Sequence, residues 1–149
     1  MTTFTAVLAG LLRADASRPL ITFYDHATDE RVELSVATYA NWVAKAASLL
    51  AEEHDLERGQ GLHLDLPAHW LGPVFLGAAW TVGLVITPAE DADAVVCGPE
   101  GLDTWAGRAG EMPVLACSLR PLGVRFADPL PPAYNLQKGI KPHHPELWR

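Results

Sequence analysis

Between residues 36 and 117, helix-like segments alternate with short apolar runs, and this alternation limits the chain to few folds. Within the helical segments apolar residues recur at steps of three and four, as at Val36, Tyr39 and Val43. The runs between them are short and rich in valine, leucine and isoleucine, which suits strands buried on both faces. The order predicts an α/β fold: a three-layer, Rossmann-like domain with a mostly parallel sheet and helices on both faces.

The same pattern gives the expected element boundaries. An N-terminal β-hairpin is predicted from strands at 20–25 and 31–34 around a polar turn. Ser35 predicts a helix start, because its hydroxyl can accept from the first free amides of a helix, and Gly83 predicts a helix end. The remaining elements are a helix from 36 to the polar segment 52–55, helices at 69–83 and 101–108, and strands at 62–66, 84–87, 94–97, 114–117 and 124–126.

The two ends of the chain differ in character. Phe4, Val7, Leu8, Leu11 and Leu12 form one stripe, and no basic residue precedes them, so an amphipathic helix is expected and not a signal peptide. Five of the chain's 12 prolines lie after residue 127. The expected organisation is therefore one domain at 1–127 followed by a proline-rich extended tail at 128–149.

Composition narrows the class of partner. The net charge is −7 and no short window concentrates lysine or arginine, so no nucleic-acid partner is expected. Residues 71–88 carry no charge, but glycines and a proline interrupt them, and we expect a helix and a strand and no membrane span. Cys97 and Cys117 fall in predicted buried strands, which indicates two reduced thiols and a cytoplasmic location.

Cofactor and metal motifs are not found in the sequence. No stretch has the three glycines of a dinucleotide-binding turn. Gly72 and Gly77 have phosphate-loop spacing, but Ala78 stands where a lysine is needed, so these glycines are interpreted as packing positions of helix 69–83. The six histidines show no metal-ligand spacing. We therefore expect neither a cofactor nor a metal.

Two places remain as candidates for chemistry. His69 and Trp70 follow a predicted strand end, where they could line a ligand pocket, but a helix start with a packed tryptophan is the favoured interpretation, since a lone histidine beside a tryptophan is not a catalytic constellation. Cys117 and Ser118 also end a strand, but no base can be assigned to either as a nucleophile, which leaves a hydrolase as a minor alternative. Three other tryptophans are predicted to anchor the core, namely Trp42, Trp80 and Trp105.

Two stretches resemble a known superfamily. ERVELSVATYANWVAKAASLLAEE and LERGQGLHLDLPAHWLGPVFLGAAWTVGLVITP resemble the N-terminal subdomain of adenylate-forming enzymes, the AMP-binding superfamily that includes acyl-CoA synthetases. Leu34-Ser35 stands at the family's Leu-Thr-Tyr helix start, Gly59-Gln60 replaces its Gly-Asp turn, and Leu66-Pro67-Ala68 stands for its Leu-Pro-Asn segment. Up to about Pro132 the chain, including RPLITFYD and SLRPLGV, is more similar still to a short actinobacterial family related to these enzymes and without an assigned activity.

What the resemblance implies about function is limited by the motifs that are missing. The superfamily holds ATP phosphates on a Ser/Thr/Gly-rich loop ending in Pro-Lys-Gly, and this sequence contains no such loop, no Thr-Glu metal pair and no ribose-binding Asp segment. No functional residue of the superfamily can therefore be assigned here. We expect a truncated, non-catalytic binding or accessory module, a pseudoenzyme on its own, with an acyl, adenylate or CoA-type ligand. The alternative is one half of a split acyl-CoA synthetase-type ligase completed by a partner chain. In either case a homodimer or protein partner is expected to cover an exposed apolar face.

Overall fold

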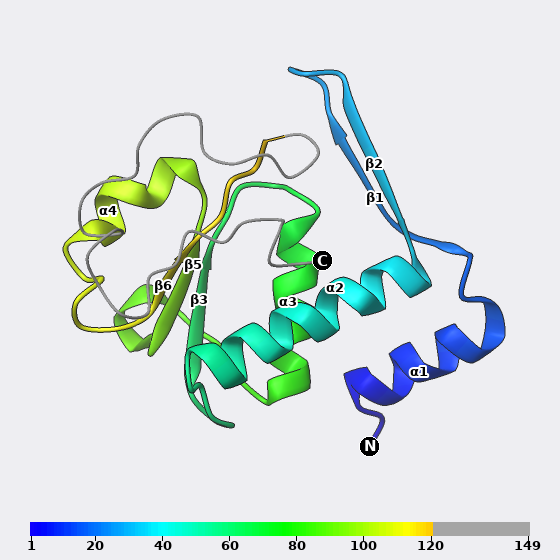
Figure 1. The fold of residues 1–149 in the computed structure, drawn as a ribbon, viewed down its shortest axis with the longest axis horizontal. Helices are drawn as coiled ribbons and strands as arrows, with labels where there is room; N and C mark the ends of the chain where they lie inside the picture. The colour runs from blue at the N-terminus through cyan, green and yellow to red at the C-terminus, as the bar shows by residue number, and fades with distance from the viewer. Residues whose placement is uncertain (121–149) are drawn as a thin grey trace.

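A four-stranded parallel sheet with helices on both faces forms the centre of the computed structural model, which describes residues 1–120 (Figure 1). The strand order is β4-β3-β5-β6, and all three neighbouring pairs are parallel. Helices α2 and α3 cover one face and α4 covers the other (Figure 1). The strands are β3 (Gly61–Asp65), β4 (Val85–Ile86), β5 (Ala94–Cys97) and β6 (Val114–Ala116), and the helices are α2 (Val36–Ser48), α3 (Leu71–Val82) and α4 (Leu102–Ala106). The predicted three-layer α/β fold is confirmed.

Alternate residues of the inner strands enter two separate hydrophobic cores. On β5, Ala94 and Val96 join the core beneath α2 and α3, whereas Val95 and Cys97 join the core beneath α4. This is the two-residue period of a strand whose faces are both covered. Cys97 and Cys117 are buried free thiols, as predicted.

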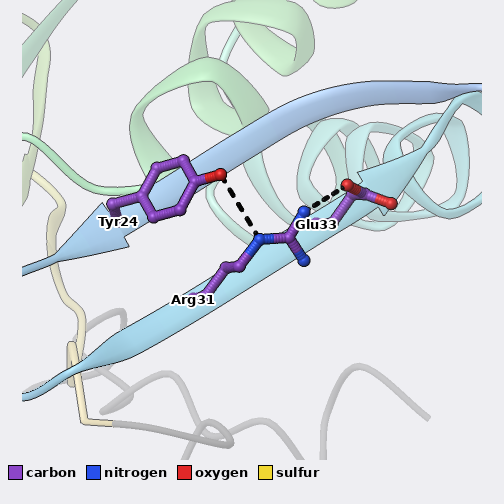
Figure 2. Close-up of polar contacts among 3 residues, drawn as sticks. All are labelled: Tyr24, Arg31 and Glu33. Carbon is purple, nitrogen blue, oxygen red and sulfur yellow. Dashed lines mark hydrogen bonds and ion pairs between the residues drawn. The ribbon is translucent and has the colours of Figure 1, made fainter.

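A separate antiparallel hairpin precedes α2. Strand β1 (Pro19–Asp25) pairs with β2 (Glu30–Ser35), and the pair extends away from the central sheet (Figure 1). On its outer face Arg31 donates to Glu33 at 2.7 Å and to the Tyr24 hydroxyl at 3.4 Å (Figure 2). The predicted hairpin and its boundaries are thus confirmed to within one residue.

The predicted caps are present at the ends of two helices. The Ser35 hydroxyl accepts from the Thr38 amide at 3.1 Å, and α2 begins at the next residue. Its last turn widens into the π-helical segment η1 (Leu49–Glu53). Gly83 ends α3 with a φ of 90°, a left-handed conformation that glycine adopts without strain.

Four elements are shorter than predicted: α3, β4, α4 (Leu102–Ala106 in place of 101–108) and β6 (Val114–Ala116 in place of 114–117). Helix α3 begins at Leu71 and not at residue 69, because the His69 imidazole accepts from the Leu71 amide and lies outside the helix. Strand β4 has two residues in place of 84–87, since the Leu84 amide still donates to Ala79 of the helix. Before α4 the chain forms the 3₁₀ turn η3 (Pro99–Gly101), and a second such turn, η2 (Ala89–Asp91), follows β4.

The N-terminal helix α1 (Phe4–Asp15) packs beside α2 and α3, and only part of its apolar stripe contacts the core. Phe4 and Leu8 pack against the core, but Val7 and Leu12 are exposed, so the five-residue stripe was predicted too wide. No helix within residues 1–120 has the length and apolar character required to span a membrane.

The tryptophans divide between core and surface. Trp105 is buried and Trp42 packs against the core, as predicted. Trp80 was predicted wrongly: its side chain is 51% exposed, because α3 turns Phe75, Ala78 and Ala79 inward. Its ring contacts Phe4 of α1, with 5.5 Å between ring centroids. The predicted strand at 124–126, the domain boundary at 127 and the tail at 128–149 lie outside the described residues.

Candidate functional site

A pocket of about 580 Å³ opens at the carboxyl ends of β3 and β5. Parallel sheets bind ligands at this edge, because the loops leaving neighbouring strands diverge there. Its wall comes from the segment after β3, the loop after β5, the first turns of α4 and the segment after β6. The described lining residues are Asp65, Leu66, Pro67, Gly98, Pro99, Glu100, Gly101, Thr104 and Leu119.

The carboxylate of Asp65 is held in place by α4. Its Oδ2 atom accepts a hydrogen bond from the indole Nε1 of buried Trp105 at 2.8 Å. Gly101 makes room for this contact, since a Cβ there would lie 2.8 Å from the same oxygen. Asp65 thus joins the end of β3 to the helix on the far side of the pocket.

The backbone amides of the loop 98–101 are already engaged. Gly98 donates to the carbonyl of Asp65 at 3.2 Å, and Gly101 donates to the carbonyl of Gly98 at 3.1 Å. Pro99 has no amide hydrogen. A phosphate-binding loop needs several backbone amides directed at the ligand, and this loop keeps only that of Glu100.

The charged side chains of the described lining are both acidic. Asp65 and Glu100 contribute carboxylates, and neither lysine, arginine nor histidine is among the described residues around the cavity. Among the other side chains of the described lining, Thr104 carries the one neutral polar group, and the leucines and prolines are apolar. The described side chains therefore offer hydrogen-bond acceptors and negative charge, which attracts cations and repels anions.

His69 and Trp70 lie in an aromatic cluster that joins the hairpin to α2 and α3. The ring centroid of His69 is 4.9 Å from that of Phe23 on β1, and the ring centroid of Trp70 is 5.0 Å from that of Trp42 on α2. Neither residue is part of the described pocket lining. Their role in ligand binding stays a prediction, beside a clear packing role.

The environment of His69 favours a neutral ring. Its Nδ1 atom accepts from the Leu71 amide at 3.1 Å, which helps to satisfy the start of α3. Burial lowers its pKa below the ordinary value, and this outweighs the opposing effects of a hydrogen bond to the backbone of Leu119 and of the Asp25 charge. The ring is therefore a hydrogen-bond acceptor that loses this function when protonated.

Cys117 and Ser118 do not form a nucleophilic site. Burial raises the pKa of the Cys117 thiol, with a further upward effect from Cys97, so the reactive thiolate is disfavoured. Ser118 is buried as well, and its hydroxyl accepts from the Arg120 amide at 3.4 Å. This environment argues against the hydrolase alternative.

Of the two glycines predicted as packing positions, Gly77 serves helix packing and Gly72 does not. A Cβ at Gly77 would lie 2.7 Å from the Tyr39 hydroxyl, so this glycine lets α3 approach α2, whereas nothing lies within 4 Å of a Cβ at Gly72. That hydroxyl donates to the carbonyl of Pro73 at 2.8 Å, and burial raises the pKa of Tyr39 to about 12. Within residues 1–120, no three histidine, cysteine, aspartate or glutamate side chains are grouped so that they could hold a metal ion.

One feature of the sequence indicates the pocket, namely acidic residues at or shortly after the ends of two strands. Asp65 ends β3, and Gly98-Pro99-Glu100-Gly101 directly follows β5. Because β3 and β5 are parallel neighbours, acidic residues at these two positions must approach the same edge. The sequence spacing does not show that β3 and β5 pair with each other. The site can be recognised only when that pairing is known.

The sequence of this chain is similar to that of a mycobacterial protein. The TIGR03089 family protein of Mycobacterium tuberculosis is 41% identical over 133 residues, which cover 85% of this chain. The chain spans about half of that relative's length (54%). No protein-family model matches the chain.

Three solved structures illustrate the fold that this chain shares. An acyl-CoA synthetase of Brucella canis matches with a TM-score of 0.63 at 16% identity, over 77% of this chain and 22% of its own. The A domain of carboxylic acid reductase from Segniliparus rugosus, bound to AMP and a carboxylic acid, matches at 0.64 and 15%, over 81% of this chain and 25% of its own. The N-terminal domain of FACL13 from Mycobacterium tuberculosis matches at 0.62 and 13%, over 87% of this chain and 41% of its own. At these identities the match concerns the fold.

Proposed function

Because this chain is related to the TIGR03089 family protein and has the fold of the N-terminal part of acyl-CoA synthetases, we propose that it is a binding module without adenylating activity of its own. The pocket at the carboxyl ends of β3 and β5 is its ligand site. In this role the fold supplies a shaped pocket and a scaffold, and any activation of a carboxylic acid takes place elsewhere.

The observation that carries the proposal is the chemistry of the loop 98–101. Adenylation works by positioning ATP and neutralising the charge on its phosphates. Here the amides of Gly98 and Gly101 bond within the protein, and the two charged side chains of the described lining, Asp65 and Glu100, are negative. These groups can supply neither of the two requirements. The sequence also contains no Ser/Thr/Gly-rich loop ending in Pro-Lys-Gly.

Thermal unfolding followed by tryptophan fluorescence tests the proposal. A ligand present at a hundred times its dissociation constant adds about 2.7 kcal/mol, enough to raise the midpoint of a domain of this size by several degrees. We expect no shift with Mg-ATP or CoA. A saturable rise of several degrees with Mg-ATP would contradict the proposal. Mg-ADP and Mg-pyrophosphate serve as controls that separate nucleotide binding from phosphate binding.

A second candidate function is one half of a split ligase. The observation that favours it is a set of large apolar side chains exposed on α3 and β4: Trp80, Val85 and Ile86. Strand β4 is also an edge of the sheet within the described residues. We propose that the occupant of this surface is a polypeptide supplying the portion that the longer M. tuberculosis relative has beyond the matched region.

Mass measurement by light scattering after size-exclusion chromatography tests this second candidate. A 1:1 complex with such a polypeptide that is lost in Trp80→Glu, and retained in the control Thr81→Glu on the same exposed turn, would support it. A homodimer equally sensitive to Trp80→Glu would replace the partner with a second copy. A monomer that binds no such polypeptide would refute the split ligase.

A further inference from the structure

We propose that the pocket beyond β3 and β5 takes a small organic molecule with an ammonium group on an apolar body. This inference deepens the proposed function and rests on it, since it gives the ligand class of the same pocket. It follows from three properties of the described lining: its charge, its apolar walls and the direction of its amides.

The charge comes from two carboxylates on neighbouring loops. Asp65 is fixed at the end of β3 by the Trp105 indole, which bonds to Oδ2 and leaves Oδ1 for a second donor. Glu100 lies in the loop after β5. A cation between these loops is attracted by carboxylates on two sides, whereas an anion is repelled by both.

The rest of the wall favours an apolar body with one polar end. Leu66, Pro67, Pro99 and Leu119 supply apolar surface, and the Thr104 hydroxyl is the one neutral polar side chain among the described lining residues. Small-molecule pockets commonly combine an apolar wall with a few convergent polar groups that set the orientation. The ammonium group would face the carboxylates and the body would lie against leucine and proline.

Two other occupants fit the same residues less well. A phosphate would meet two carboxylates and a loop whose Gly98 and Gly101 amides are engaged. A divalent cation such as calcium needs six or more oxygen ligands, and within residues 1–120 no three acidic, histidine or cysteine residues converge to form a metal site. An organic ammonium needs only two or three acceptors.

A matched series of probes tests the ligand class on the uniformly ¹⁵N-labelled chain. The probes are 3-phenylpropylamine, 3-phenylpropanol and 3-phenylpropanoate, which share one shape and differ in charge. We expect the amine to move the amide signals of Gly98, Gly101 and Thr104 and the indole signal of Trp105, with a dissociation constant on the order of 1 mM for so small a ligand. The alcohol should bind more weakly, and the carboxylate should leave these signals in place.

Variants show whether the two carboxylates are responsible. Glu100→Gln and Asp65→Asn should each weaken amine binding by roughly two- to fivefold, the range for partly exposed ion pairs. Asp65→Asn keeps an acceptor for the Trp105 indole, so the pocket wall is retained. The control is Glu90→Gln, an exposed acidic residue of η2 outside the pocket, which should leave the affinity unchanged.

The outcomes separate this inference from the function on which it rests. Tighter binding of the carboxylate than of the amine at the same signals would overturn the ligand class and leave the pocket as a binding site. Equal binding of amine and alcohol, unaffected by Glu100→Gln and Asp65→Asn, would also overturn it. Failure of all three probes to move any pocket signal would overturn both the ligand class and the assignment of the pocket.

Discussion

At the scale of single residues, the two most informative positions are His69 and Gly101. His69 draws attention as a histidine beside a tryptophan, yet its imidazole accepts from the Leu71 amide and packs against the Phe23 ring at a tilted angle. Gly101 is inconspicuous in the sequence, yet it is the residue that allows Asp65 and Trp105 to meet. Each leads to a measurable consequence.

Stability should fall as the solution becomes acidic, with His69 as one cause. Burial lowers its folded-state pKa below the ordinary value of 6.5, so the unfolded chain binds the proton more readily. Its contribution is therefore complete above pH 6.5 and is lost as the pH falls below it through the lowered folded-state pKa. Urea unfolding at pH 7, 6 and 5 should show a decreasing midpoint.

The variant His69→Asn isolates this effect. Asparagine can still accept from the Leu71 amide but does not titrate. We expect a smaller decrease between pH 7 and pH 5 in this variant than in the parent chain. An identical pH dependence in both chains would mean that His69 does not contribute.

Gly101→Ala should destabilise the domain by about 1–3 kcal/mol, the usual cost of overpacking. The added methyl group would lie 2.8 Å from Asp65 Oδ2 and 3.1 Å from the Cys97 Cβ, closer than these atoms allow without a shift. Gly107→Ala is the matched control, because nothing lies within 4 Å of a Cβ there and its φ of −68° suits alanine. Equal urea midpoints for the two variants would contradict the described packing.

At the scale of elements, the sequence predicted kinds and order better than lengths. Ser35 correctly predicted the start of α2, and Gly83 the end of α3, because a cap is a local interaction between neighbouring residues. The start of α3 was misplaced because His69 belongs to a contact with the hairpin that no local pattern encodes. Trp80 was misplaced because apolar residues fill every side of α3, so periodicity could not identify the inner face.

The candidate site was less predictable than the fold. Its residues come from the ends of β3, β5 and β6, and their proximity depends on the order of the strands. Strand order is a property of the assembled sheet. The resemblance to adenylate-forming enzymes predicted the fold, and of the matched segments Leu66-Pro67 lies in the pocket lining, although that match gave no indication of a site.

Gly77 determines how closely three helices approach. A Cβ at this position would lie 2.7 Å from the Tyr39 hydroxyl, 2.8 Å from Phe4 and 2.9 Å from Val43. We expect Gly77→Ala to cost about 1–3 kcal/mol by separating α3 from α1 and α2, and to increase amide exchange in α1. The control Gly10→Ala, on α1 with open space around it, should be neutral or stabilising by up to about 1 kcal/mol. If Gly77→Ala were as stable as Gly10→Ala, the three helices would not be in contact as described.

At the scale of the whole molecule, two features matter most: the fold and the side chains that line its pocket. The sheet, its helices and the hairpin match the N-terminal part of acyl-CoA synthetases, but this chain spans only 22% to 41% of the three solved structures compared above. At its ligand-binding edge the described lining offers carboxylates and apolar surface. Because one fold hosts many functions, the shared fold by itself does not assign the activity of this chain.

ATP–pyrophosphate exchange, measured on the purified chain with a panel of aliphatic and aromatic carboxylic acids, tests the central claim most directly. We expect exchange equal to that of a heat-denatured sample for every acid, because the described pocket has no group that neutralises a phosphate. Exchange that depends on the acid and rises with the amount of chain would contradict the claim, and would show that this chain activates carboxylic acids by itself.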